Sequence, residues 1–413
     1  MATLVPTDRT ASTARTAPSG EIAASRPPAR PARLAVLRHV GPNWYAGVMG
    51  TAIVASAGAT LPMEPLGVAS PLDVPVLRAA CVTVWALSAL MLLLLLTARA
   101  GHWIHHRDQA RAHLLDPSVA PFYGCLAMAL LAVGGATLTV GRHVIGESAA
   151  VTVDAVLFTA GTLVGLAAAV AVPYLMVVRY RVRPGDASPV WLLPVVAPMV
   201  SAALGPGLIP YLPAGQWREA LLLACYAMFG MSLLATLTLL PLIFGRLVTY
   251  GPLPLALTPA LFLVLGPLGQ STTAVGHLAL AAPDALTSTA SAPPASYVPA
   301  LDAFAVLYGV PVLGFALLWL ALAVAMVVRA ARRGMPFSMT WWAFTFPVGT
   351  CVTGAAGLAH ATGLVALAWL SLALFVLLTA AWAVAWTRTA HGLVSGVLPA
   401  APPVPGPATA RTR

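Results

Sequence analysis

The chain alternates long apolar runs with short polar loops, and ten of the runs approach the length of a membrane-crossing helix. Such a helix needs about 20 mainly apolar residues to cross the hydrocarbon core of a bilayer. The runs lie at residues 44–60, 76–98, 121–140, 153–177, 189–207, 219–243, 257–276, 303–327, 343–363 and 366–386. The pattern predicts an all-α integral membrane protein with ten transmembrane helices embedded in a lipid bilayer.

Glycine and proline are concentrated in alternate runs. The odd-numbered runs hold 23 of these residues in 97 positions, whereas the even-numbered runs hold 8 in 119, and the second and tenth runs hold neither. Irregular helices are tolerated at membrane depth only where protein or a watery cavity satisfies the freed backbone groups. We therefore expect five helical hairpins around a central pore, with kinked odd helices inside and even helices outside.

The arginines are distributed unevenly between the two sides of this arrangement. Nineteen of the 22 precede the first run, follow an even-numbered run or lie in the C-terminal tail, which leaves Arg78, Arg142 and Arg218 for the opposite side. Short cytoplasmic loops carry the positive charge of a membrane protein. The pattern predicts a plasma-membrane domain at 41–390, with disordered cytoplasmic tails at 1–40 and 391–413.

Composition argues against several other classes of protein. With 59% hydrophobic and 8% charged residues and a mean hydropathy of +0.87, the chain cannot cover a water-facing surface with polar groups. The net charge of +10 is not gathered on a basic face interleaved with aromatic residues, so no nucleic-acid partner is expected. The four cysteines lie far apart in apolar runs, which fits neither a redox pair nor a zinc site.

Catalytic and metal-binding patterns are missing from the sequence. It contains no GxSxG, HExxH or phosphate-binding glycine loop. The segment GHWIHHRDQARAH at 101–113 holds four histidines, but their spacing matches no standard zinc pattern and favours a basic cytoplasmic loop. We expect no cofactor and no metal, and a membrane-embedded enzyme is the weaker alternative to a transporter.

The predicted pore contains no central carboxylate. Asp154, Glu219 and Asp302 fall at the ends of their runs, where we expect solvated interfacial charges, and His277 is likewise expected at an interface. A path without acidic groups in a positively charged protein favours anions over cations.

Small polar side chains on the odd runs are the candidates for lining the path. Each could instead bond to its own backbone or to a neighbouring helix, and the sequence leaves both open. The candidates are Thr51, Ser201, Gln270, Ser271, Thr272, Thr345 and Thr350. Helix kinks are expected at Pro198, Pro267 and Pro347.

Several segments of the odd runs resemble one family, the tellurite-resistance/dicarboxylate transporters. They are NWYAGVMGTAIVA (43–55), LLPVVAPMVSAALG (192–205), TPALFLVLGPLGQS (258–271) and WWAFTFPVGT (341–350), with PFYGCLAMAL (121–130) as a weaker fifth. The resemblance covers about residues 40 to 390. It implies five hairpins around a pore and a homotrimer in which each chain keeps its own pore.

The family includes tellurite-resistance permeases, fungal malate permeases and sulfite efflux pumps, and plant anion channels. In its bacterial and plant members a phenylalanine on the ninth helix plugs the pore, and the matching position is Phe346. A bulky apolar ring beside a kink can close a narrow path by dewetting. Phe344 is expected to be an ordinary packing residue. Pro347 directly follows Phe346, as in the fungal-like branch, so both a channel and a carrier stay open.

The expected function is transport of a small anion, either sulfite or a C4-dicarboxylate such as malate, with a possible relation to tellurite. The alternative is a proton-coupled dicarboxylate carrier in which the substrate itself carries the proton.

Overall fold

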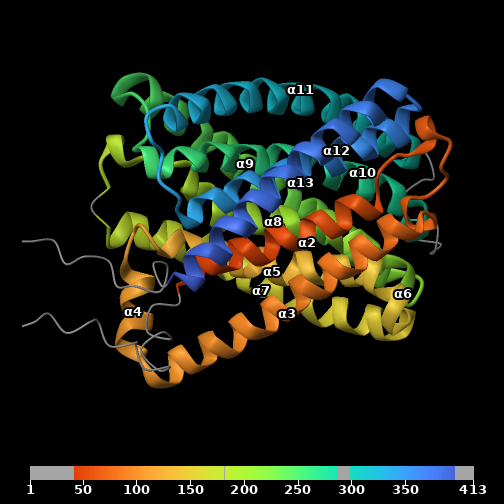
Figure 1. The fold of residues 1–413 in the computed structure, drawn as a ribbon. Helices are drawn as coiled ribbons and strands as arrows, with labels where there is room; N and C mark the ends of the chain where they lie inside the picture. Colours follow the sequence, from red (N-terminus) through yellow and green to blue (C-terminus); the bar gives the residue numbers. More distant parts are fainter. Residues whose placement is uncertain (1–40, 181, 287–296, 396–413) are drawn as a thin grey trace, which may run out of the picture.

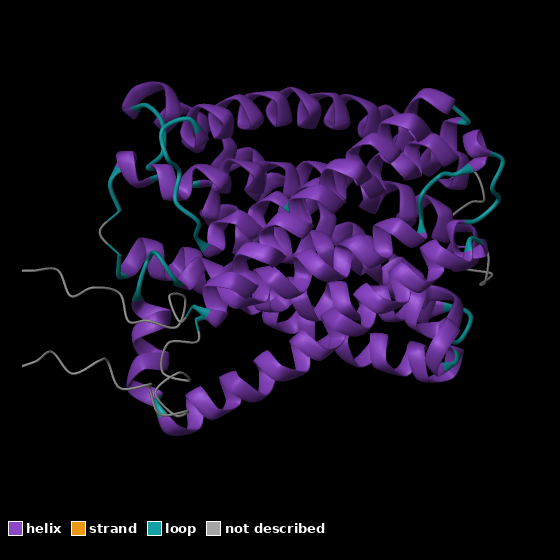
Figure 2. Ribbon diagram, viewed as in Figure 1, coloured by secondary structure: helices purple, strands orange, loops and turns teal. Residues whose placement is uncertain are grey.

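The computed structural model describes residues 41–180, 182–286 and 297–395. The predicted N-terminal tail at 1–40 lies outside these residues, as do residues 396–413 of the predicted C-terminal tail. The first residues of that predicted tail, 391–394, belong instead to the helix that ends at Val394. Within the described ranges every regular element is a helix (Figure 2).

Five shorter helices form the inner part of the bundle. They are α2 (Tyr45–Ala59), α5 (Tyr123–Ala136), α8 (Leu192–Leu204), α10 (Leu265–Leu286) and α12 (Phe346–Thr362). Each is entered through a 3-10 segment, namely η1 (Pro42–Trp44), η4 (Ala120–Phe122), η7 (Pro189–Trp191), η9 (Leu255–Val264) and η10 (Met339–Phe344). A π-helical segment, η5 (Thr137–Gly141), extends α5, and a 3-10 segment, η8 (Gly205–Tyr211), extends α8.

Five longer helices form the outer part. They are α3 (Pro75–His105), α7 (Glu147–Val178), α9 (Gln216–Tyr250), α11 (Tyr297–Ala331) and α13 (Val365–Val394). The short helices α4 (Arg107–Leu115) and α6 (Arg142–Ile145) and the 3-10 turns η2 (Glu64–Leu66), η3 (Pro71–Asp73) and η6 (Pro184–Asp186) lie in the connections.

Burial separates the two sets of helices as the glycine and proline pattern predicts. In the most apolar window of each outer helix only 22% to 28% of residues are buried, against 83% to 89% for the segments that contain α5, α8, α10 and α12. In α2 nearly every residue is buried. The prediction that the helices rich in glycine and proline lie inside and the others outside is therefore confirmed.

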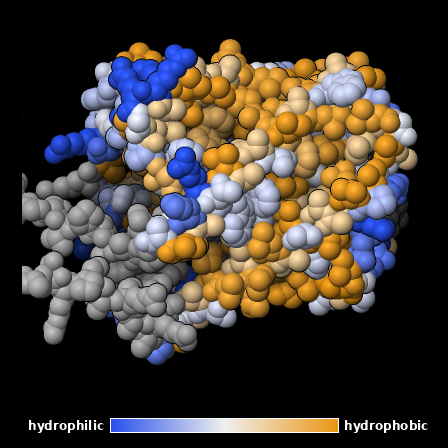
Figure 3. Space-filling model, viewed as in Figure 1, coloured by the Kyte–Doolittle hydropathy of each residue, from blue (hydrophilic) through white to orange (hydrophobic). Residues whose placement is uncertain are grey.

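The bundle has the apolar belt of a membrane protein. Its long helices run roughly side by side along one direction (Figure 1), and hydrophilic residues gather at the two ends of the visible surface with apolar residues between them (Figure 3). In the described part of the chain nine helical segments are long and apolar enough to cross a membrane. Because α2 has only 15 residues and is not among the nine, the count of ten crossings stays a prediction.

Glycine brings the inner helices into close contact. A Cβ atom on Gly269 of α10 would lie 2.5 Å from Thr350 Oγ1 and 2.6 Å from the Cys351 backbone nitrogen of α12. A Cβ atom on Gly124 of α5 would collide with the backbone of Leu193 in α8. These glycines lie within regular helices, so they serve packing, and the irregular backbone is concentrated in the 3-10 and π segments.

One charged side chain differs from expectation. Asp154 on α7 was expected to be solvated at an interface, but it is only 2% exposed. A Cβ atom on Gly134 of α5 would lie 2.5 Å from its Oδ1 atom, so the carboxyl group is packed against the inner helix. The reason is that α7 begins at Glu147, earlier than the predicted run, which places Asp154 two turns inside the helix.

Candidate functional site

A cavity of about 570 Å³ lies among the inner helices. Residues of α2, α5, η5, α8, α10 and α12 line it, together with the connections that follow α2 and α12. The first turn of the outer helix α13 also contributes, through Val365 and Ala368. Hydroxyl and amide groups supply most of its polar lining: Ser56, Thr60, Thr139, Gln270, Thr273 and Thr353. Its titratable groups are Glu64, His277 and His360, and among the described residues no arginine lines it.

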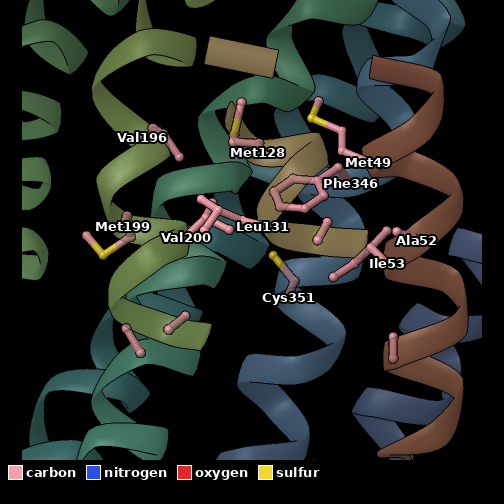
Figure 4. Close-up of a cluster of buried hydrophobic side chains, with 14 of the residues drawn as sticks. Met49, Ala52, Ile53, Met128, Leu131, Val196, Met199, Val200, Phe346 and Cys351 are labelled. Atoms are coloured by element: carbon pink, nitrogen blue, oxygen red, sulfur yellow. The ribbon is translucent and has the colours of Figure 1, made fainter. Parts of the chain in front are cut away.

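Phe346 lines this cavity. Its ring is 3% exposed and also lines a second, very small cavity of about 10 Å³, whose other walls are apolar. Among the described residues no other belongs to both linings. Figure 4 shows the ring in the middle of apolar side chains from other inner helices, among them Met49, Met128 and Leu131. Phe346 therefore borders both spaces.

The backbone around Phe346 changes from one helix type to another. The 3-10 segment η10 ends at Phe344, and α12 begins at Phe346 with Pro347 in its first turn. A proline in the first turn loses no hydrogen bond, because the N–H groups there have no partner within the helix. Pro347 therefore marks the start of α12, and the expected bend within a continuous α-helix is replaced by this change of helix type.

The other two predicted kink positions differ from each other. Pro267 lies in the first turn of α10, directly after η9, and so resembles Pro347. Pro198 lies inside α8, where a proline removes a backbone hydrogen bond.

Thr345 joins the two helical segments. Its hydroxyl group donates to the Trp342 carbonyl at 2.7 Å, and its own carbonyl accepts the Gly349 N–H at 2.9 Å. Gly50 of α2 allows this turn to pack directly against the Thr345 side chain. The backbone is thus hydrogen-bonded before and after Phe346, which fixes the direction in which its Cα–Cβ bond points.

Phe344 lies in a different environment from Phe346. Its ring packs edge-on against Phe262, with 4.8 Å between ring centroids, and against Trp341 at 5.8 Å. Phe344 lines neither of the two cavities. The two neighbouring rings therefore have separate surroundings, one between cavities and the other among aromatic side chains.

Of the seven candidate lining residues, Gln270 lies in the wall of the large cavity. The other six have hydroxyl groups hydrogen-bonded to helix carbonyls or to a neighbouring side chain, and they are absent from the lining: Thr51, Ser201, Ser271, Thr272, Thr345 and Thr350. Thr51 also accepts the Trp382 indole N–H at 3.2 Å, which joins α2 to α13.

The sequence reasoning missed other polar residues that do line the cavity. The hydroxyl groups of Thr273 and Thr353 lie 2.7 Å apart and join α10 to α12. His277 was expected at an interface, but its Nδ1 atom lies 2.7 Å from the Ala203 carbonyl and its side chain lines the cavity. Gln270, Thr273 and His277 are spaced by three and four residues, which places them on one face of α10.

The histidine-rich segment does not form a recognisable metal site. His102 of α3 and His113 of α4 stack with 5.4 Å between ring centroids, and His106 lies near them. Among the residues that the structure describes, no group of three or more potential ligands could hold a metal ion. The four cysteines are buried and free.

Comparison with known proteins gives a family match over most of the chain. The model of the SLAC1 family, described as voltage-dependent anion channel, matches residues 39–390. Two proteins of Methanocaldococcus jannaschii that are named uncharacterised transporters are 25% and 23% identical to this chain. The matches cover 88% and 86% of this chain and 96% and 95% of the relatives. The sulfite efflux pump SSU1 of Trichophyton rubrum is 27% identical over 76% of this chain and 80% of its own length.

Proposed function

The chain belongs to the SLAC1 family of voltage-dependent anion channels, and from this premise we propose that it carries sulfite across the membrane through a path closed by Phe346. Anion transport is the activity that the family and the named relatives indicate. Sulfite is the proposed substrate because the fungal relatives are named sulfite efflux pumps. These names indicate a transporter and give no support to a membrane-embedded enzyme.

The observation that carries the proposal is the position of Phe346 between two cavities. The space of about 570 Å³ on one side is large enough for an oxyanion with part of its hydration shell, whereas the space of about 10 Å³ on the other side holds at most one water molecule. An ion that passes must lose its water beside the apolar ring, or the ring must move. A hydrophobic constriction of this kind closes a path by dewetting.

The lining of the large cavity suits an anion that moves rather than one that binds tightly. The Gln270 amide can donate hydrogen bonds to an oxyanion, whereas the lining hydroxyl groups already donate to helix carbonyls. The described lining contains no arginine that would hold the anion as a permanent ion pair. Conduction requires binding that is favourable enough for entry and weak enough for exit. A neutral amide donor in a wide cavity meets both conditions.

The experiment compares the two neighbouring phenylalanines in proteoliposomes. Wild type, Phe346→Ala and Phe344→Ala would be tested for flux of sulfite, malate, nitrate and chloride. We expect Phe346→Ala to raise anion flux, because the apolar partition is removed. Phe344→Ala is the matched control, since the same ring is removed from a position that lines neither cavity. Equal flux in wild type and Phe346→Ala would contradict the gate.

The proposed orientation places both termini in the cytoplasm, as the arginine distribution supports. The first turn of α2 and the last turn of α13 lie at the same end of the bundle (Figure 1), as this orientation requires. The large cavity then opens to the outside, because the connections after α2 and α12 line it. Export toward this side would agree with the names of the fungal relatives.

A proton-coupled dicarboxylate carrier is the second candidate. Its support is the presence of His277, His360 and Glu64 in the lining, since these groups can exchange protons with a substrate in the cavity. Flux of malate driven by a pH gradient alone, with no malate gradient, would favour the carrier over the channel.

A homotrimer with one pore per chain is the proposed assembly, following the family resemblance. The cavity and Phe346 both belong to a single chain, which is compatible with one path per subunit. Light scattering of the purified protein in detergent would measure the number of chains.

A further inference from the structure

One amide group in the wall of the large cavity has no partner of its own. The Gln270 side chain is 3% exposed and lines the cavity, and its Oε1 atom is buried without a hydrogen-bond partner. Neither polar atom of the amide forms a hydrogen bond within the described part of the chain. Buried amides are normally paired, because an unpaired donor or acceptor costs free energy that a ligand can restore.

Gln270 lies close to the level of the gate. Gly266, four residues earlier on α10, lines the small cavity together with Phe346, whereas Gln270 lines the large one. Four helical residues span about 6 Å, so the amide lies one turn from the level of the ring. Thr273 of α10 and Thr353 of α12 also line the cavity. Thr273 is seven residues from Gly266, and Thr353 is seven residues from Phe346, which is about 10 Å along each helix axis.

The backbone around Gln270 is held in place by contact with α12. The neighbouring Gly269 lies against Thr350 and the Cys351 backbone, too close for any side chain. Thr273, one turn later, donates to the Gly269 carbonyl at 3.1 Å and meets the Thr353 hydroxyl at 2.7 Å. The amide is therefore presented to the cavity from a rigid position beside the helix that carries the gate.

We propose that Gln270 selects a singly protonated oxyanion at the approach to the gate. An amide supplies two N–H donors and one carbonyl acceptor. A hydrogen sulfite ion, or a dicarboxylate carrying one proton, offers oxygen atoms that accept from the N–H groups and an O–H group that donates to the carbonyl. Chloride, nitrate and fully deprotonated dianions satisfy the donors only and leave the carbonyl unpaired. The inference rests on the proposed function, since it names the form of the transported ion.

Other titratable groups share the cavity and must be separated from the effect of Gln270. They are Glu64 near the entrance, His277 two turns further along α10 and His360 near the end of α12. All three groups are present in wild type and in every variant. The comparison between wild type and variant at one pH therefore isolates the amide.

The test uses Gln270→Met, which keeps the length of the side chain and removes both kinds of hydrogen-bonding atom. Initial rates of sulfite, nitrate and chloride flux into proteoliposomes would be measured from about pH 5.5 to 8, the range in which sulfite gains its proton and an ordinary histidine titrates. We expect the wild-type KM for total sulfite to fall as the singly protonated fraction rises. In Gln270→Met the KM for sulfite should rise at least about tenfold, as the loss of charge-assisted hydrogen bonds predicts. Nitrate and chloride rates should fall less than the sulfite rate, since these ions lose only their contacts to the amide N–H groups and never donate to the amide carbonyl.

Thr139→Val is the matched control. Thr139 lines the same cavity, but its hydroxyl group already donates to the Gly135 carbonyl at 2.9 Å, so its removal should leave the preference for sulfite unchanged. Gln270→Leu serves as a second variant if Gln270→Met does not fold, with correct folding judged by a wild-type elution volume and melting temperature.

The outcomes separate the inference from the function on which it rests. Wild-type flux of sulfite together with an unchanged KM in Gln270→Met would overturn the role of the amide alone. An equal loss of sulfite, nitrate and chloride would also overturn it, because the variant would then have damaged the path and not the selection. Wild-type vesicles that transport neither sulfite nor malate would overturn the proposed function, and the inference with it.

Discussion

Replacing Gly269 by alanine tests whether the contact between α10 and α12 holds the site together. The added Cβ atom would lie 2.5 Å from Thr350 Oγ1 and 2.6 Å from the Cys351 backbone nitrogen. The hydroxyl group could rotate, but the backbone of α12 cannot give way without moving the helix that carries Phe346. Overpacking of this kind typically costs about 1–3 kcal/mol.

Gly276 on the same helix offers a control at which alanine is expected to raise stability. No atom outside the helix lies within 4 Å of the Cβ position at Gly276. Alanine there gains the helix propensity of about 0.8–1 kcal/mol without a clash. Gly269→Ala gains the same propensity but bears the overpacking cost, so it should be less stable than Gly276→Ala by about 1–3 kcal/mol.

Thermal unfolding in detergent measures this difference, with both variants compared at equal protein and detergent concentration. Flux in proteoliposomes gives the second measurement, because a displaced α12 changes the position of the Phe346 ring. We expect Gly269→Ala to unfold at a lower temperature than Gly276→Ala and to show altered flux. A melting temperature for Gly269→Ala equal to that of Gly276→Ala would refute the packing argument.

Three further predictions follow from the fold. Phe344→Ala should lower stability by about 3 kcal/mol without opening the path, whereas Phe346→Ala should raise flux; unfolding and flux measured together distinguish these effects. Trp319→Phe should lower stability by about 1–3 kcal/mol, because its indole N–H donates to a carbonyl of η9 at 3.0 Å and that buried carbonyl would lose its partner; the melting temperature measures this. Cysteines placed at Glu64 and Asp284 should react with an impermeant thiol reagent from outside intact cells, and labelling only after lysis would contradict the proposed topology.

The arrangement of inner and outer helices could be predicted from the sequence because the bilayer constrains composition strongly. A helix that faces lipid has no partner for a freed backbone group, so glycine and proline are concentrated in the helices that protein surrounds. The motif WWAFTFPVGT also led to Phe346, which lines two cavities. Both inferences depended only on which helices lie inside. Neither required knowledge of which face of a helix points toward the cavity.

The prediction of lining residues was wrong for most candidates, because lining depends on which face of each helix points toward the cavity. Ser271 and Thr272 were selected from the sequence beside Gln270, but Thr273 and His277 share the lining with it. A 3-10 helix turns about 120° per residue and an α-helix about 100°. The ten residues of η9 precede α10 and shift its phase by about 200° relative to a continuous α-helix. The phase therefore depends on where the helix type changes, which composition does not reveal.

One chain forms both cavities and contains Phe346, which predicts how transport depends on the fraction of active chains. The large cavity, Phe346 and the small cavity are all formed by the same polypeptide, so an inactive neighbour has no residue to withhold from an active one. When wild-type and blocked chains are expressed together, transport should therefore decline in direct proportion to the blocked fraction, however many chains associate. A blocked chain is therefore not expected to have a dominant-negative effect on the active chains around it.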